Sequence, residues 1–142
     1  MNKLTKTFLI TILLIVLCFS GTSFANASTN DNTNARLAHT NMANFLFTAT
    51  NAEGEVVVQY AGNSDSFARA DVTVKLQKKI LLFFWTDVDE WSASSTEENG
   101  IFSHIFTLNG TGTYKATFTL TVTGMDGTVD TVTKEIESKY SK

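Results

Sequence analysis

YKATFTLTVT, residues 114–123, alternates apolar and polar side chains without a break. Successive side chains of a strand point to opposite faces, so this stretch would have one apolar face and one face of lysine and threonine. A helix would scatter the two sets around its circumference. The stretch therefore predicts a half-buried β-strand.

Further strand patterns lie on both sides of this stretch, separated by turn signals every 8–14 positions. Threonine alone occupies 18 of the 115 positions from Ser28 onward, and β-branched residues suit a pleated surface. With no proline in the chain, the turns must use Gly, Asn and Asp. About seven strands result, which predicts an all-β fold, an antiparallel two-sheet sandwich. The other regular segments are 44–50, 55–60, 71–78, 102–108 and 128–136.

Ile80–Trp91 (ILLFFWTDVDEW) is the ambiguous segment. Its apolar residues also fit one stripe along a helix, and for a short run the spacing of apolar residues alone does not distinguish a helix from a strand. The aromatic cluster and the neighbouring strands favour a strand. Both faces of that strand would be apolar, so the second face is either buried centrally or exposed as a contact surface.

The first 27 residues are typical of a secretory signal peptide, which would form a signal helix ahead of the fold. Lys3 and Lys6 precede the apolar run Phe8–Phe19, and Ala25-Asn26-Ala27 supplies the small residues of a cleavage site. The alternative is an uncleaved membrane anchor, although the run is short for a span. We expect a secreted chain cleaved between Ala27 and Ser28, with a flexible segment over 28–43 and the sandwich over 44–142.

The segment that follows cleavage has nine basic and 14 acidic residues, a net charge of -5, and no cysteine. Such a charge does not suit binding to nucleic acid. Membrane contact is expected only through the signal peptide before its removal. Without disulfides, the exported domain would depend on its apolar core.

Gly112-Thr113-Tyr114 resembles the start of strand F in immunoglobulin-like domains, where the tyrosine hydroxyl bonds back to the preceding loop. The resemblance implies that Tyr114 is this corner residue. It places Ala116 at the second cysteine of such domains, Val57 or Val58 at the first, and Leu76 at the core tryptophan.

The segment from Arg69 to Tyr140 also resembles a group of small secreted proteins of Gram-positive bacteria, classed as a domain of unknown function. The resemblance lies in Leu76-Gln77-Lys78-Lys79, in a strand bearing Trp85 and Trp91, and in the G-x-Y strand start. It implies export and a β-sandwich, and brings no catalytic residues.

Residues for catalysis are scarce, so we expect no enzyme, no cofactor and no metal. His39 and His104 are 65 positions apart, and His104 alternates with phenylalanines, which favours a partly buried, hydrogen-bonded side chain. There is no G-x-S-x-G motif. Asp87 and Asp89 would share one face of a strand and could approach a calcium ion, but the spacing of a calcium loop is missing.

Candidate ligand-binding residues gather in one segment: Phe83, Trp85, Asp87, Asp89 and Trp91. Aromatic side chains beside carboxylates are typical of sugar-binding surfaces. The sequence thus predicts a non-enzymatic sandwich that binds an unidentified partner, such as a cell-surface polymer or a protein. The alternatives are a glycan or cell-wall binder acting through Trp85 and Trp91, and a membrane-active, bacteriocin-like protein acting through Leu81–Trp85.

Overall fold

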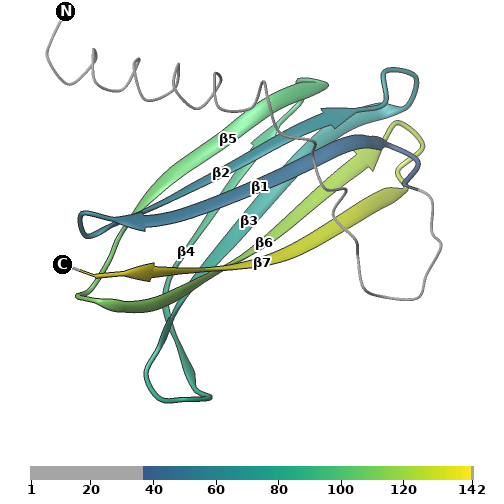
Figure 1. Ribbon diagram of the computed structural model, residues 1–142. Helices are drawn as coiled ribbons and strands as arrows, with labels where there is room; N and C mark the ends of the chain where they lie inside the picture. Colours follow the sequence, from purple (N-terminus) through teal and green to yellow (C-terminus); the bar gives the residue numbers. More distant parts are fainter. Residues whose placement is uncertain (1–36, 142) are drawn as a thin grey trace, which may run out of the picture. The chain divides into compact units, whose positions relative to one another are not determined.

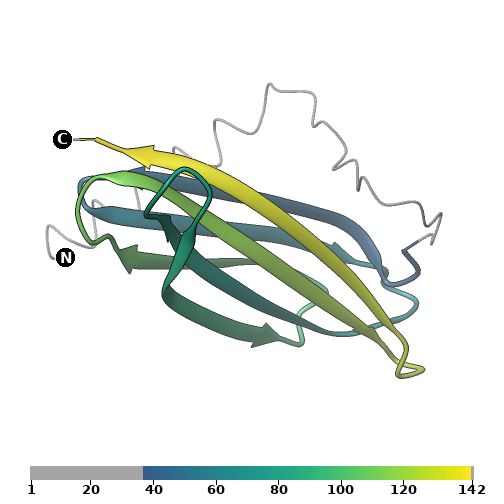
Figure 2. The same ribbon diagram turned by 90° about the horizontal axis from the view of Figure 1, so that it is seen from below.

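The computed structural model describes residues 37–141, and these residues form seven strands in two antiparallel sheets (Figures 1 and 2). One sheet has the order β1-β2-β5, and the other has the order β4-β3-β6-β7. The all-β sandwich predicted from the sequence is confirmed. The predicted signal peptide and residues 28–36 lie outside the described part. The strands are β1 (Thr40–Thr50), β2 (Glu53–Gly62), β3 (Phe67–Lys79), β4 (Trp85–Ser95), β5 (Asn99–Thr107), β6 (Gly112–Gly124) and β7 (Val129–Tyr140).

The strand order is that of an immunoglobulin-like sandwich. When the strands are lettered A, B, C, C′, E, F and G in chain order, the two sheets read A-B-E and C′-C-F-G. The chain crosses between the sheets after β2, β4 and β5. Residues 114–123, whose alternation predicted a strand, lie in β6 in the interior of the larger sheet, and every second residue from Tyr114 onward is buried.

The core consists of inward residues of both sheets, including Val58, Leu76, Ala116 and Phe118. Leu76 pairs directly with Ala116. Val58 belongs to the core cluster, whereas Val57 is buried outside that cluster, so Val58 is the residue of the pair at the position of the first immunoglobulin cysteine. Aliphatic packing thus occupies the places where such domains carry a disulfide and a tryptophan.

The tyrosine corner is present. The Tyr114 hydroxyl is buried and donates a hydrogen bond of 2.7 Å to the carbonyl oxygen of Gly110. Gly110 has a φ of 75°, a left-handed conformation that glycine adopts without strain. This bond fixes the loop that carries the chain from one sheet to the other.

The ordered domain begins earlier than the sequence indicated. β1 starts at Thr40, four residues before the expected boundary at Asn44, and the residue before it, His39, is already buried. The segment 80–91 also differs, because β4 starts only at Trp85 and residues 80–84 form the connecting loop. The strand prediction is therefore confirmed for 85–91 and wrong for 80–84.

Candidate functional site

The connection between β3 and β4 is an exposed loop of five apolar residues, Ile80–Phe84, named here the hairpin tip. It projects beyond the ends of the neighbouring strands (Figure 1). The backbone N–H of Ile80 donates a 3.0 Å hydrogen bond to the carbonyl of Phe84, which closes the loop. Exposure ranges from 58% for Ile80 to 84% for Phe83. Exposed side chains of this size in an unbroken run indicate a contact surface.

The hairpin tip is exposed because the core ends before it. In β3 the last core residue is Leu76, and Lys78 and Lys79 follow it before the strand ends. No strand of the opposite sheet pairs with or covers the loop in the described part of the chain. The interpretation of this segment as a centrally buried strand is thus wrong for residues 80–84, which form an apolar loop exposed to solvent.

Four lysines surround the base of the hairpin tip, and we name them the lysine collar: Lys78, Lys79, Lys115 and Lys139. Register places Lys115 beside Gln77 and Lys139 beside Thr113, the residue that faces the loop. The ammonium groups of Lys79 and Lys115 lie 5.5 Å and 4.8 Å from the centre of the Trp85 ring. These are cation–π distances, so two positive charges contact the indole.

The collar lysines differ in their other partners. Lys78 donates a hydrogen bond to the carbonyl of Asn109 and lies 5.4 Å from the Tyr114 ring centre. Lys115 forms an ion pair of 3.3 Å with Glu135. Within residues 37–141, Lys79 and Lys139 take part in no ion pair. Positive charge at the base of the tip is therefore only partly neutralised.

A bulge in β4 separates the two aspartates that the sequence placed on one face. The pairing shifts between Leu76 and Gln77, so that Leu76 pairs with Asp89 while Gln77 pairs with Asp87 and Val88 has no partner in the ladder. Paired residues of an antiparallel ladder lie on the same face. Because Leu76 faces the core and Gln77 faces outward, Asp89 is on the inner face and Asp87 on the outer one.

Asp87 already has two partners on the outer face. Its carboxylate accepts a 2.8 Å hydrogen bond from Gln77 and forms a 2.9 Å ion pair with Lys75. The hydrogen bond from Lys75, with that from Gln77, lowers the pKa of Asp87, and the same contact raises the pKa of Lys75. Asp87 and Asp89 are therefore not placed to share a calcium ion on one face of the strand. The described residues contain no cluster of three or more metal-ligating side chains.

The bulge divides the two tryptophans in the same way. Trp85 pairs with Lys79 on the outer face, and Trp91 pairs with Val74 on the core side. The Trp91 ring is stacked on His104, with centroids 4.9 Å apart and planes 7° from parallel, and it packs against the core. Of the five predicted ligand residues, Phe83, Trp85 and Asp87 are at or near the tip, while Asp89 and Trp91 belong to the inner side of β4.

His104 is half-buried, as expected, but the contacts that hold it are aromatic. Its ring stacks on Trp91 and meets Phe106 edge-on at 4.7 Å. It thereby fills the gap between the edge strands β4 and β5.

Sequence reasoning missed a polar cluster at the opposite end of the sandwich. His39 Nδ1 lies 2.9 Å from Ser66 Oγ, and His39 Nε2 lies 2.7 Å from Thr128 Oγ1, which donates to Asp126 at 2.7 Å. These two contacts occupy both ring nitrogens of His39. A Cβ atom at position 124 would collide with the His39 ring, so the backbone of Gly124 packs closely against that ring.

This cluster holds the start of β1 in place through hydrogen bonds. The side chain of Asp130 accepts hydrogen bonds from the backbone N–H groups of Ala38 and His39, at 3.2 Å and 2.7 Å. Burial alone would raise the pKa of Asp130, but these backbone bonds bring the pKa of the carboxyl below its ordinary value. No sequence signal joins residues about 90 positions apart, since only the fold brings them together.

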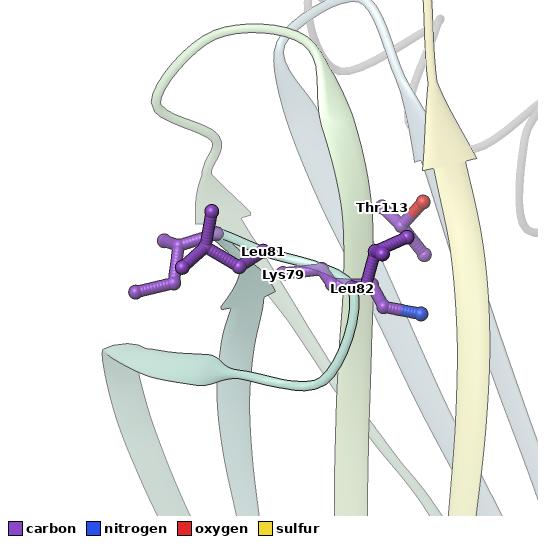
Figure 3. A pocket seen from close by; sticks show the side chains of 5 residues that line it. Lys79, Leu81, Leu82 and Thr113 are labelled. Carbon is purple, nitrogen blue, oxygen red and sulfur yellow. The ribbon is translucent and has the colours of Figure 1, made fainter.

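A small open hollow lies beside the hairpin tip, lined by Lys79, Ile80, Leu81, Leu82 and Thr113. Figure 3 shows Leu81 and Leu82 on opposite sides of the loop, with Leu82 on the side of Thr113. This lining contains neither a carboxylate nor an imidazole for acid–base chemistry. Within residues 37–141 there is no helix long and apolar enough to cross a membrane.

Comparison with known proteins identifies no family. No family model matches the chain, and no curated protein matches it. Similar solved structures include the following three. A family 76 glycoside hydrolase from a bovine Bacteroides thetaiotaomicron strain matches 71% of this chain at 12% identity and a TM-score of 0.38, but the match spans only 20% of that chain.

The other two structures are smaller. The soluble domain of PmoD from Methylocystis sp. ATCC 49242 (Rockwell) matches 66% of this chain and 77% of its own, at 13% identity and a TM-score of 0.38. A CARDB domain from Pyrococcus furiosus, solved with di-metal ions, matches 84% of this chain and all of its own, at 16% identity and a TM-score of 0.43. The fold assignment rests on the strand pairing of the chain itself.

Proposed function

We propose that the chain is an exported, non-enzymatic β-sandwich that binds a partner through the hairpin tip. The observation that carries the proposal is the unbroken run of five exposed apolar side chains, Ile80–Phe84. Each Å² of apolar surface kept in water costs about 25 cal/mol relative to burial. A loop connecting two strands needs only polar turn residues, so leucine and phenylalanine at these positions favour a role in binding.

The glycan alternative receives less support from the geometry. A sugar-binding platform would need the open faces of Trp85 and Trp91 on one surface, with carboxylates beside them. The two rings instead lie on opposite faces of β4. One ring is covered by His104, and the other is contacted by two lysines.

Export is the second part of the proposal, and it rests on the sequence of residues 1–27. Expression of the full chain in a bacterial host that secretes proteins should release a form into the medium. N-terminal sequencing of that form should begin at Ser28. A released protein that still starts at Met1, or retention of the whole chain in the cytoplasm, would contradict export.

Binding through the tip can be tested with isolated bacterial cell envelopes. Residues 28–142 contain all seven strands and the whole described core, so this segment has what it needs to fold. We expect it to sediment with the envelopes and the L82S/F83S variant to lose most of this binding. The matched control is I101S/I105S, which removes two exposed apolar side chains from β5 and should bind normally. Equal binding by L82S/F83S and the unchanged chain would refute the proposal.

A further inference from the structure

We infer that the partner of the hairpin tip is an anionic lipid bilayer, with the tip inserted among the lipids and the lysine collar at the headgroup phosphates. The inference rests on the proposed binding role of the tip. It follows from how apolar, aromatic and positive groups are layered at this end of the sandwich.

The first layer is the apolar loop itself. Leu81, Leu82 and Phe83 are 65%, 80% and 84% exposed, and they occupy the middle of the loop. Leu81 and Leu82 point to opposite sides (Figure 3). A protein groove would take one side of such a loop, whereas a fluid acyl region surrounds a protruding loop on all sides. Apolar groups that bind at a bilayer surface enter the boundary between headgroups and acyl chains to a depth of about 5–10 Å.

The second layer is Trp85, the first residue after the loop. Its indole is half-buried and lies on the outer face, within cation–π distance of the ammonium groups of Lys79 and Lys115. Tryptophan is enriched at the boundary between membrane and water because its ring is apolar and its N–H is polar. Here the Trp85 ring lies between the apolar hairpin tip and the charged lysine collar.

The third layer is the lysine collar. Lysine stems can lie along apolar surface while the ammonium groups reach toward phosphate. Of the acids in this region, Glu135 is paired with Lys115, and Asp87 is paired with Lys75. The others are Glu137, which pairs in register with Lys115, and Glu53, the first residue of β2. The three remaining collar lysines, Lys78, Lys79 and Lys139, outnumber these two acids. Clusters of positive charge beside a membrane-binding segment favour anionic lipid.

The charge of the opposite end completes the argument. Glu97 and Glu98 lie between β4 and β5, Asp65 lies between β2 and β3, and Asp126 lies between β6 and β7. All these connections are at the end of the sandwich away from the hairpin tip, as the antiparallel pairing requires. An anionic surface would repel that acidic end and attract the collar, so the molecule would approach with the tip first.

Vesicle flotation tests the inference with residues 28–142. Vesicles of phosphatidylcholine containing phosphatidylglycerol are compared with vesicles of phosphatidylcholine alone. We expect at least about tenfold tighter binding to the anionic vesicles, and weaker binding when salt is raised from about 0.1 M to about 0.5 M. Trp85 fluorescence in a W91F background should shift to shorter wavelength on binding, because Trp85 is then the one tryptophan of that segment.

Two variants separate the apolar and charged contributions. L82S/F83S should lose binding to both kinds of vesicle, whereas K79Q/K139Q should lose the preference for anionic lipid. R69Q/K134Q removes the same amount of charge away from the tip, so it should retain that preference. Urea unfolding of each variant identifies any loss of binding that results from a loss of folding.

Equal binding to the two kinds of vesicle, or an unchanged preference in K79Q/K139Q, would overturn the inference. So would tip-dependent binding to envelopes without binding to vesicles, which points to a protein or polymer and leaves the proposed function standing. Tip-dependent self-association without vesicle binding, seen by analytical ultracentrifugation, would assign the tip to a second copy of the chain. If L82S/F83S changes neither envelope nor vesicle binding, the proposed function itself fails.

Discussion

At the scale of single residues, a few buried polar groups fix the connections between strands. The Tyr114 hydroxyl bonds to Gly110, and the Asp130 carboxylate bonds to the backbone before β1. Buried polar groups cost free energy unless they are paired, so each of these bonds selects one path for the chain. The tyrosine corner could be predicted from G-x-Y, because all its atoms lie within five residues. The Asp130 contact could not.

Tyr114→Phe removes one buried hydrogen bond and leaves the Gly110 carbonyl without that donor. We expect the free energy of unfolding to fall by about 1–2 kcal/mol. Urea denaturation followed by circular dichroism measures the change. Tyr140→Phe is the control, since Tyr140 is also buried but its hydroxyl makes no hydrogen bond within the described part of the chain, and it should change stability little.

Asp130 makes stability depend on pH. Because its pKa is lower in the folded chain than in the unfolded one, the unfolded state binds more protons and stability falls as the solution is acidified. Most of this loss should occur between about pH 5 and pH 2. Asp71, Asp87 and Asp126 also have lowered pKa values, so they act in the same direction.

Asp130→Asn should lower the free energy of unfolding at neutral pH by about 1–3 kcal/mol, because an amide accepts through only one of its two terminal atoms. The same variant should lose less stability than the unchanged chain between about pH 5 and pH 2. Urea midpoints measured across this range give both results. Parallel pH profiles for the two proteins would show that Asp130 does not contribute.

At the scale of elements, β6 and β4 show what alternation can and cannot predict. In β6 every second residue is buried, and sequence alone gave the strand and its inward face. In β4 the bulge at Val88 interrupts the alternation, so Asp87 and Asp89 lie on different faces although they are two residues apart. The bulge at Val88 could not be predicted from the sequence. β4 is an edge strand with little buried surface, so its apolar and polar residues do not reveal where one extra residue is inserted.

The hairpin tip should contribute to binding and not to stability. We expect L82S/F83S to change the free energy of unfolding by no more than about 0.5 kcal/mol, because both side chains are already in water. Phe118→Leu, a smaller change in a fully buried side chain, should cost about 1 kcal/mol or more. Thermal or urea unfolding of the three proteins makes the comparison. A large loss in the tip variant would mean that the loop packs against the sandwich.

At the scale of the whole molecule, the two sheets are joined differently along their two sides. On one side, the backbone N–H of Ala49 in β1 donates a 3.1 Å hydrogen bond to the Ser138 hydroxyl of β7. On the other, the stacked rings of Trp91 and His104 connect β4 to β5. The two-layer architecture could be predicted from strand count and alternation. The pairing of the seven strands and these lateral contacts could not, because they join residues distant in sequence.

Trp91→Ala should therefore destabilise the sandwich. Removal of a half-buried ring that stacks on His104 should cost about 1–3 kcal/mol, somewhat less than for a fully buried tryptophan. Envelope binding measured well below the unfolding midpoint should be unchanged. Lost binding in a folded Trp91→Ala protein would instead support a ligand role for this residue.

The bulge at Val88 gives the two halves of β4 separate tasks. Trp85 and Asp87 lie on the outer face, whereas Trp91 packs against the core and the exposed Asp89 is on the same side of the strand as Trp91. Substitutions before Val88 can thus alter binding without disturbing the stacking of Trp91 on His104 that connects the two sheets. Deletion of Val88 would restore regular alternation and place both halves of β4 on one pattern of faces. A substitution near the hairpin tip would then also affect the folding of the sandwich.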